Sequence, residues 1–430
     1  MSISNHGAMS RLHKTAGVLI APFLIVAALS GFFYALAPSI ESVVYKNEIV
    51  ASGSGEAHSL DEQIAAAQKV YPDLAVSKVQ AFDDSAKNTR VLFADDALKS
   101  SSYAHAVFVD PATLEIKGDL VQYGSSRALP LRSWISEGHR RLWLGDAGRI
   151  YSELAASWLG ALAIMGIYLW FKRRRKAGKM LTLHSKIGAW LLPGFVFLTI
   201  TGLTWSLVAG ENISTLREKM DWMQPKPAAT AAADPHAEHH HHMDMTGDMN
   251  VMGGADALAA ARSAGLTGIL DMTPPSAETP AWTVTEARQD YKLSYDAIAV
   301  DPHTGEVVDR VDFKDWPLMA KVVPWLIQLH MGTLFGIYNQ VVLALLALGL
   351  LAVSVMGLWM WFSRPKRALQ HLKLSPALVV GAVLYSIIAP LFGASLVLFF
   401  LVDWAVQRAK KAKQTEPRET QEGESIKQPV

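Results

Sequence analysis

Long runs without acidic or basic side chains dominate the hydrophobic pattern of this chain. A membrane-spanning helix needs about 20 predominantly apolar residues. Five uncharged runs approach or exceed that length, and they cover residues 15–40, 154–171, 187–210, 322–363 and 374–402. The fourth run is too long for one span, so we place its helix near residues 339–362. The pattern predicts a polytopic α-helical membrane protein with four core spans and a fifth C-terminal apolar segment.

Two groups of positions recur at fixed spacings. Four positions recur 171 residues later, with His13, Gly17, Pro22 and Gly31 matched by His184, Gly188, Pro193 and Gly202. Four others recur 191 residues later, with His139, Gly145, Gly166 and Trp170 matched by His330, Gly336, Gly357 and Trp361. We infer an internal tandem duplication in which each copy carries two spans and two histidines.

The polar stretches between the spans repeat as well, and they predict two small α+β domains. In the first stretch a predicted capping box begins at Ser59, and Leu60, Ile64 and Ala67 then form one helical face. Alternating side chains predict strands at residues 90–94 and 105–109. The second stretch offers the same order of elements at residues 254–264, 281–286 and 292–300.

The resulting organisation alternates spans with extracytoplasmic domains. Its expected parts are a first span at 1–40, a first α+β domain at 41–133, a second span at 134–176, a third span at 177–210, a linker at 211–253, a second α+β domain at 254–320, a fourth span at 321–367, the fifth apolar segment at 368–405 and a polar tail at 406–430.

The distribution of charge orients these parts in a membrane. The net charge of +1 gives no indication of a nucleic-acid partner. Basic residues cluster before the first span, at 172–176 and at 364–367, and such clusters accumulate on the cytoplasmic side. We therefore expect a multi-pass protein of the bacterial inner membrane, in contact with the lipid bilayer, with a cytoplasmic N-terminus and periplasmic loops. A further basic cluster after the fifth segment does not fit simple alternation, so that segment is either a full span or a re-entrant one.

The chain contains no cysteine. Disulfides, iron–sulfur clusters with cysteine ligands and thioether-linked haem are therefore excluded. A redox centre in this protein must be bound non-covalently, by histidine, methionine, tyrosine or carboxylate side chains.

The four repeated histidines are candidate ligands of haem b iron. Two opposed imidazoles give an iron centre that changes oxidation state without opening a substrate position. His13 and His184 precede spans that start on the cytoplasmic face, so we expect them to share an inner haem. His139 and His330 precede spans that enter from outside and are expected to share an outer haem. A glycine one turn after each inner histidine would clear space for the macrocycle. The alternative is that each histidine is an interfacial residue that pairs with headgroups or a carbonyl.

The ordered set of motifs resembles the PepSY-associated transmembrane helix family. The resemblance rests on Leu12-His13 and Ser30-Gly31, on their second-copy equivalents, and on the Val-Asp-Pro turns of the polar stretches, and it extends over roughly residues 10–375. It implies that the two α+β domains are PepSY domains. Because the family includes iron-regulated membrane proteins and ferric-siderophore reductases that bind haem b, it also implies an oxidoreductase. The second copy departs from the first at Thr333, where the first has Leu142.

A dense group of histidines and methionines lies in the 211–253 linker and has no counterpart in the first copy. Its candidate metal ligands are His236, His239, His240, His241, His242, Met243 and Met245. Histidine mixed with methionine favours copper and other soft or borderline metals. The alternative is a solvated low-complexity linker.

The polar domains show no catalytic constellation, and Asp110 and Asp301, each followed by proline, are expected to fix turns. The sequence has no phosphate loop and no nicotinamide or flavin fingerprint, so electrons would come from quinol or a separate cytoplasmic reductase. The leading hypothesis is a haem b reductase that passes electrons outward to a metal complex. The resemblance implies a ferric siderophore, and the histidine–methionine group adds copper. Two alternatives stay open: a non-enzymatic, membrane-anchored binding or assembly protein, and a metal-transport accessory.

Overall fold

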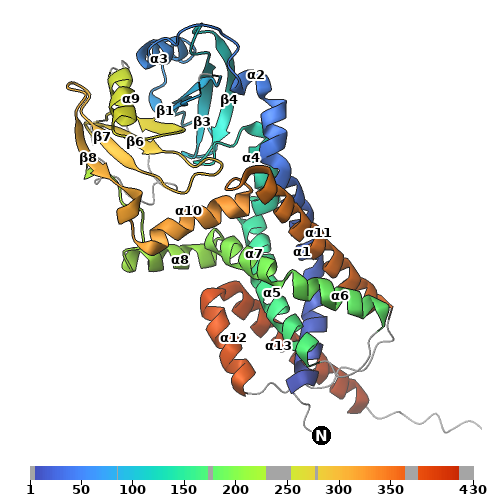
Figure 1. Cartoon of the computed structure of the whole chain (residues 1–430). Coiled ribbons are helices and arrows are strands. Elements are labelled where there is room, and N and C mark those ends of the chain that lie inside the picture. The colour runs from blue at the N-terminus through green and yellow to red at the C-terminus, as the bar shows by residue number, and fades with distance from the viewer. Residues whose placement is uncertain are drawn as a thin grey trace, which may run out of the picture.

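The protein consists of a β-sheet part and a helical part (Figure 1). The computed structural model describes residues 5–84, 86–172, 178–228, 253–276, 279–363 and 376–415. The long first helix, α1 (Asn5–Val44), runs through the helical part from the N-terminus towards the sheet (Figure 1). The sheet therefore lies at the opposite end of the helical part from the N-terminus.

Eight strands form one antiparallel sheet. Their bounds are β1 (Val76–Ala81), β2 (Thr89–Phe93), β3 (Tyr103–Val109), β4 (Ile116–Tyr123), β5 (Leu270–Thr273), β6 (Trp282–Glu286), β7 (Ala297–Val300) and β8 (Val307–Val311). The order β4-β3-β2-β1-β5-β6-β7-β8 consists of two meanders, one from each copy, joined where β1 pairs with β5. The two expected α+β units are thus not separate, because pairing at this seam satisfies backbone groups that each unit alone would leave unpaired at an open edge.

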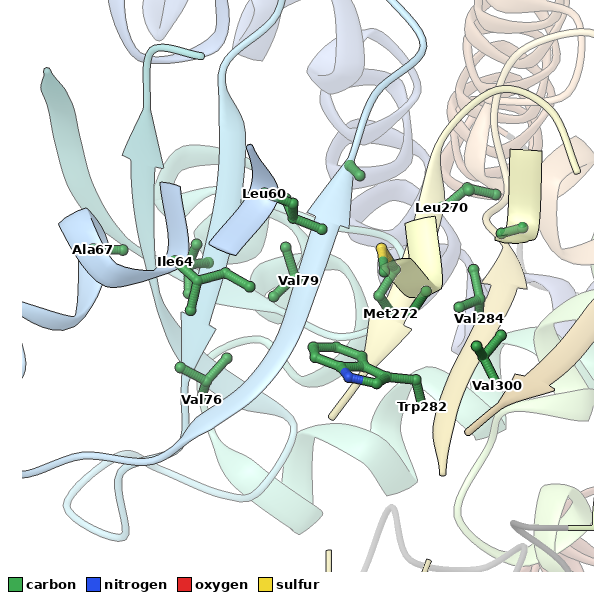
Figure 2. Close-up of a cluster of buried hydrophobic side chains, with 14 of the residues drawn as sticks. Leu60, Ile64, Ala67, Val76, Val79, Leu270, Met272, Trp282, Val284 and Val300 are labelled. Atoms are coloured by element: carbon green, nitrogen blue, oxygen red, sulfur yellow. The ribbon is translucent and has the colours of Figure 1, made fainter. Parts of the chain in front are cut away.

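Two helices cover one face of the sheet, α3 (Leu60–Gln68) and α9 (Gly254–Ser263). The predicted capping box is confirmed, because the Ser59 and Glu62 side chains each bond to the other's backbone N–H. The predicted helical face is also confirmed, since Leu60, Ile64 and Ala67 are all buried. Figure 2 shows these side chains converging with others from both meanders, including the fully buried Trp282. Burying an aliphatic or aromatic side chain of this size contributes about 1.5–3 kcal/mol, so this shared core stabilises both copies together.

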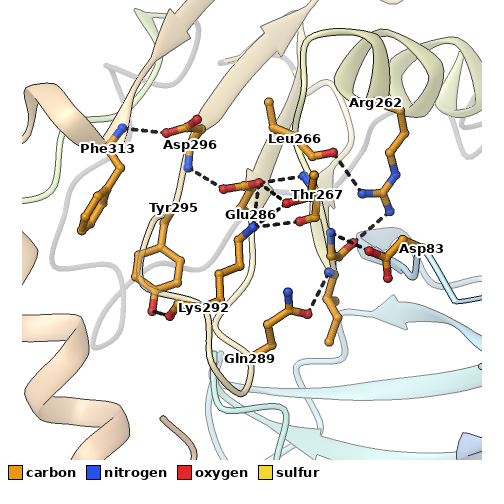
Figure 3. A network of polar contacts seen from close by, with 12 residues as sticks. Asp83, Arg262, Leu266, Thr267, Glu286, Gln289, Lys292, Tyr295, Asp296 and Phe313 are labelled. Atoms are coloured by element: carbon orange, nitrogen blue, oxygen red, sulfur yellow. Dashed lines mark hydrogen bonds and ion pairs between the residues drawn. The ribbon is translucent and has the colours of Figure 1, made fainter. Parts of the chain in front are cut away.

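Polar contacts also tie the two meanders together (Figure 3). The carboxylate of Asp83, which follows β1, accepts a hydrogen bond of 2.9 Å from the backbone N–H of Gly268, just before β5. The buried Glu286 accepts from the backbone of Thr267 at 2.7 Å and from Lys292 Nζ at 2.8 Å. Every charged group in this network has a partner, so burial leaves none of them isolated.

The two Asp-Pro turns match the prediction. The Asp110 carboxylate accepts hydrogen bonds from the backbone of Ser52 and Gly53, both at 2.8 Å, and from Ala112 within its own turn. Among the described residues, the Asp301 carboxylate accepts hydrogen bonds from within its own turn, including backbone N–H groups at 2.8 and 3.0 Å. The first turn therefore also anchors the chain that leads from α1 into the sheet.

The helical part contains three described helices that are long and apolar enough to cross a membrane: α1, α5 (Gly145–Phe171) and α11 (Gly336–Phe362). A fourth crossing results if α6 (Lys179–Trp190) and α7 (Leu192–Thr204) count as one span, because these two helices form a pair bent by 59°. The expected third span therefore corresponds to this bent pair, which is either a broken span or a re-entrant loop. The basic clusters at 172–176 and 364–367 lie largely outside the described residues.

The break between α6 and α7 combines a local proline–glycine sequence with close packing against α11. Pro22 in the first copy lies inside the continuous α1, whereas its equivalent Pro193 is followed by Gly194. A Cβ at Gly194 would lie 2.2 Å from a methyl carbon of Leu346, and one at Gly349 would lie 2.0 Å from Leu191. The missing side chains let α11 press against the bend, and a proline next to a glycine is a common site of such kinks.

A short helix precedes the second span of each copy, α4 (Pro130–Arg141) before α5 and α10 (Leu318–Met331) before α11. The sequence predicted one span over residues 134–176, and the structure divides this segment between α4 and α5. Gly145 and Gly336 open the following helices with φ of 59° and 52°, a left-handed conformation that glycine adopts without strain. Glu41 on α1 accepts the backbone N–H of Leu129 at 2.7 Å and so caps α4. The single turns α2 (Lys46–Ile49) and η2 (Phe313–Asp315) complete the connections.

The fifth apolar segment is a helical hairpin made of α12 (Pro376–Ile388) and α13 (Pro390–Thr415). The Tyr385 and Phe392 rings pack edge to face across the break, with centroids 4.9 Å apart. The Tyr385 hydroxyl donates to the Ser157 carbonyl at 2.7 Å, and Trp158 Nε1 donates to Ser395 Oγ at 2.9 Å, so the hairpin is docked on α5. Both arms point back towards the end of the bundle that holds the N-terminus (Figure 1).

One more helix, α8 (Val208–Lys219), crosses the expected boundary between the third span and the linker. Its N-terminus is capped by Glu153 of α5, whose carboxylate accepts the backbone N–H groups of Val208 at 2.8 Å and Ala209 at 3.0 Å. Glu153 is only 1% exposed. A carboxylate inside an apolar helix is thus explained by the two backbone donors that it satisfies.

Candidate functional site

The four repeated histidines lie on four helices and meet as two pairs. His13 of α1 faces His184 of α6 with ring centroids 6.4 Å apart and ring planes at 75°. His139 of α4 faces His330 of α10 with centroids 6.5 Å apart and planes at 41°. Each pair takes one histidine from each copy, and these are the two pairings expected from the sequence. We call them the inner pair and the outer pair.

In the inner pair, one ring nitrogen of His184 has a hydrogen-bond partner that fixes which nitrogen carries the proton. Its Nδ1 lies 3.0 Å from the carbonyl oxygen of Val353. Because a carbonyl only accepts, Nδ1 carries the proton and Nε2 keeps its lone pair. Leu162, which is equivalent to Val353 in the first copy, has its backbone beside His13. Among the described residues, however, no partner meets hydrogen-bond geometry with His13 Nδ1.

At the outer pair, the hydrogen-bond partners of the Nδ1 atoms are hydroxyl groups. Ser30 Oγ lies 3.0 Å from His139 Nδ1, and Thr201 Oγ1 lies 2.7 Å from His330 Nδ1. Each hydroxyl donates its own proton to the backbone carbonyl four residues earlier, at 2.8 and 2.7 Å respectively. The hydroxyls can then only accept from the imidazoles, so both outer histidines are protonated on Nδ1. Their Nε2 atoms are left with a free lone pair.

Glycines allow the helices to approach three of the four rings. A Cβ at Gly31 would lie 3.1 Å from Cε1 of His139, and one at Gly166 would lie 3.4 Å from Cε1 of His13. At Gly357 the corresponding distance to His184 is 3.8 Å, an ordinary contact. The first of these contacts is tighter than packing normally permits, so the glycine at position 31 is required by the position of the outer histidine.

The glycines one turn from the inner histidines have a different environment. A Cβ at Gly17 would meet Leu162 only at 3.9 Å, and one at Gly188 would meet none of the described residues within 4 Å. A Cβ would thus fit at both glycines without a clash, so the described neighbours do not require glycine at either position.

Aromatic side chains enclose the outer pair. The Tyr34 ring is parallel to that of His139 within 8°, with centroids 5.9 Å apart. Trp205 meets His330 edge to face at 5.7 Å, and Phe197 lies at 6.3 Å. Together with the hydroxyl contacts, this packing holds both outer rings in fixed orientations.

The two pairs lie near opposite ends of the helical bundle. On α1, His13 belongs to the inner pair and Gly31 contacts the outer pair. At 1.5 Å per residue, the 18 positions between them correspond to about 27 Å along the helix. This is close to the hydrocarbon thickness of a bilayer, about 30 Å. One pair thus lies at each end of a membrane-length bundle.

Each pair brings two imidazoles together. No group of three or more His, Cys, Asp or Glu side chains within the described ranges could hold a metal ion. The predicted ligands His236, His239, His240, His241, His242, Met243 and Met245 all lie outside the described residues. The hypothesis of a copper site there remains one from the sequence alone.

The sequence did not reveal what orients the histidines. Ser30 and Thr201 stand in the repeated motifs, 171 positions apart, and their shared hydroxyl was a signal that could have been used. The carbonyl of Val353 gives no such signal, because every residue has one. The contact becomes visible only once α6 and α11 are packed together.

Comparison with known proteins gives one family match, and a search of curated proteins found no match for this chain. The sequence model of the PepSY-associated TM region matches residues 10–364, and the chain belongs to that family.

Proposed function

We propose that this protein is a haem b membrane reductase, which passes electrons from an inner to an outer bis-histidine centre and on to an extracytoplasmic metal complex. The observation that carries the proposal is the geometry of the two histidine pairs. Their ring centroids are 6.4 and 6.5 Å apart, and three of the four Nδ1 atoms are engaged with oxygen.

The pair separations fit two imidazoles that share one iron. A metal–imidazole bond is about 2 Å long, and the nitrogen lies about 1 Å from its ring centre, so two opposed ligands have centroids about 6 Å apart. His13 and His184 would hold the inner haem, and His139 and His330 the outer one. The inner assignment is compatible with Gly17 and Gly188, where even an added Cβ would meet no clash.

The residues around the histidines would set the properties of each centre. Haem supplies one-electron oxidation and reduction when bound. The oxygen acceptors at Nδ1 fix the tautomer and raise the basicity of Nε2, as the outer partners of metal-bound histidines generally do. With imidazole on both faces, no position is left for a substrate. The two pairs are therefore suited to passing electrons on.

We propose that the electron donor and the acceptor bind at opposite ends of the bundle. We propose that quinol or a separate cytoplasmic reductase supplies electrons at the inner pair. The acceptor is a ferric complex near the outer pair, for which a ferric siderophore is the leading class and a copper complex the second. A purely anchoring or binding role gains nothing from four imidazoles placed in facing pairs, since ionisable groups within a membrane are unfavourable unless they have a function.

The test is a haem count on the full-length protein purified in detergent after haem-replete expression. Reduced-minus-oxidised spectra with a pyridine haemochrome assay are expected to give two b-type haems per chain. His330→Ala and His13→Ala should each lose one of them. His303→Ala is the matched control, because this histidine is exposed on the sheet part and should leave both haems in place. A haem-free protein, or unchanged spectra in the two pair variants, would refute the proposal.

A further inference from the structure

A cavity of about 290 Å³ lies between the sheet part and the helical part. Its wall combines segments far apart in the sequence: the β1–β2 connection, the turn after β4 and the loop after β6 from the sheet part, with α1, α4 and α10 from the helical part. The volume is at the lower end of the range for small-molecule sites, about 300–1,000 Å³. It suits a small ligand.

The cavity is strongly basic. Five positively charged side chains line it, from Lys87, Arg90, Arg127, Arg132 and Arg288, against two carboxylates. One of the carboxylates, Glu41, is already paired with Arg132 at 3.1 Å. The other is Asp290, and one of the lysine and arginine groups, Lys87, also lies 4.0 Å from Asp84 outside the lining. The excess of positive charge indicates a negatively charged ligand.

Two of the buried guanidinium groups have unsatisfied donors. Among the described residues, Arg127 Nη1 and Arg90 Nε make no hydrogen bond although both atoms are buried. Their other nitrogens are used within the protein, since Arg127 Nη2 donates to the Arg288 carbonyl and Arg90 Nη1 donates to Gln122 Oε1 at 3.1 Å. Buried donors without acceptors are unfavourable, so a ligand carboxylate that reached these two side chains would stabilise the complex.

The charge state of Arg90 agrees with a site for a negatively charged ligand. Burial, and then repulsion from Arg127, lowers the pKa of Arg90 to about 9, so this side chain stays charged at neutral pH. Burial likewise lowers the pKa of Arg127. Burial raises the pKa of Asp290, although Arg127, Lys87 and Arg132 act to lower it.

The cavity lies directly beyond the outer histidine pair. Gln328 and Met331, which line it, flank His330 on α10, and Arg132 lies on α4 with His139. On α1, the lining residue Ser39 is nine positions beyond Ser30, about 13 Å along the helix. A ligand in the cavity would be close to the outer pair without touching it.

We propose that this cavity binds a small polyanion that carries several carboxylates. In a step that rests on the proposed function, we infer that the polyanion is the chelating shell of the acceptor complex. The protein then selects anionic metal chelates over neutral or cationic ones, because only a ligand with negative groups neutralises the cavity.

Binding can be tested without electron transfer by using gallium citrate, whose metal is not reduced. Isothermal titration of the full-length, haem-loaded protein in an uncharged detergent is expected to show saturable binding that weakens as salt is added. Arg127→Gln and Lys87→Gln should each weaken binding about tenfold or more, as expected for losing a hydrogen bond to a charged group. Lys69→Gln is the charge-matched control, since Lys69 is exposed at the end of α3.

The outcomes separate the two proposals. Lys87 is partly exposed, so its substitution leaves the fold intact, and unchanged binding in both Arg127→Gln and Lys87→Gln overturns the anion site. Free citrate that binds as tightly as gallium citrate overturns the assignment to a metal chelate. A haem count on the same sample decides the proposed function independently, because gallium citrate binding requires no electron transfer.

Discussion

Replacing Gly31 by alanine tests whether the outer histidine is held as the structure describes. The added Cβ would lie 3.1 Å from Cε1 of His139, whereas carbon atoms pack at about 3.5–4.0 Å. The imidazole would have to move by about half an ångström. It cannot simply turn aside, because Nδ1 is bonded to Ser30 and the ring is stacked on Tyr34.

The expected size of the effect follows from two opposing contributions. Overpacking of this kind costs about 1–3 kcal/mol. Alanine in place of glycine inside a helix stabilises by about 0.5–1 kcal/mol. The net result is a loss of about 1 kcal/mol, concentrated at the outer pair, so that haem affinity there falls about fivefold to tenfold. The inner pair should be unaffected.

The assay is haem retention at the two centres, measured by visible spectra after stepwise dilution in detergent. Gly357→Ala is the matched control, because its Cβ would meet the His184 ring at 3.8 Å and needs no movement. The control should retain both haems and gain slightly in thermal stability. If Gly31→Ala behaves like Gly357→Ala, the tight packing that we describe around the outer histidine is wrong.

Three further predictions follow from other contacts. Ser30→Ala removes the acceptor at His139 Nδ1. The reduction potential of the proposed outer haem should therefore rise by about 40 mV, equivalent to about 1 kcal/mol. An unchanged potential in a potentiometric titration would contradict the assigned tautomer. Burial acts to raise the pKa of Asp110, but bonds from four backbone N–H groups outweigh it and lower that pKa. Its stabilising effect is therefore present above the ordinary value near about 4 and lost as the pH falls further, and Asp110→Asn should flatten the pH dependence of thermal unfolding in that acidic range. Glu153→Ala leaves two buried N–H groups of α8 without acceptors and should destabilise by about 1–3 kcal/mol in thermal melts, whereas the exposed Glu211→Ala should have little effect.

Features that depend on neighbouring residues were predictable from the sequence. The apolar runs predicted α1, α5 and α11, and the Ser59 capping box predicted the start of α3, because hydrogen bonding within one helix depends on local spacing. The strands at 90–94 and 105–109 also match β2 and β3. The duplicated frames further predicted which histidines lie together, since equivalent positions in two copies meet around a pseudo-two-fold axis.

Features that depend on contacts between distant segments were not predictable. The pairing of β1 with β5 joins strands from different copies, and neither strand shows a distinctive pattern of its own. The break at Leu191 depends on Gly194 and Gly349 facing side chains of other helices. The acceptors at the histidines and the basic cavity likewise assemble only when the helices and the sheet are packed.

The seam between β1 and β5 has a consequence for how this chain arose and how it can change. Like the two histidine pairs, it takes one member from each copy, so a half-length ancestor would complete neither its sheet nor its sites without a second molecule. The arrangement is that of an isologous homodimer fused into one polypeptide. In a homodimer, every substitution appears twice and both halves must tolerate it. Fusion removes that constraint, and the two halves have since diverged. The second has a broken first helix and the histidine–methionine insertion, while the first has a continuous helix and no such insertion.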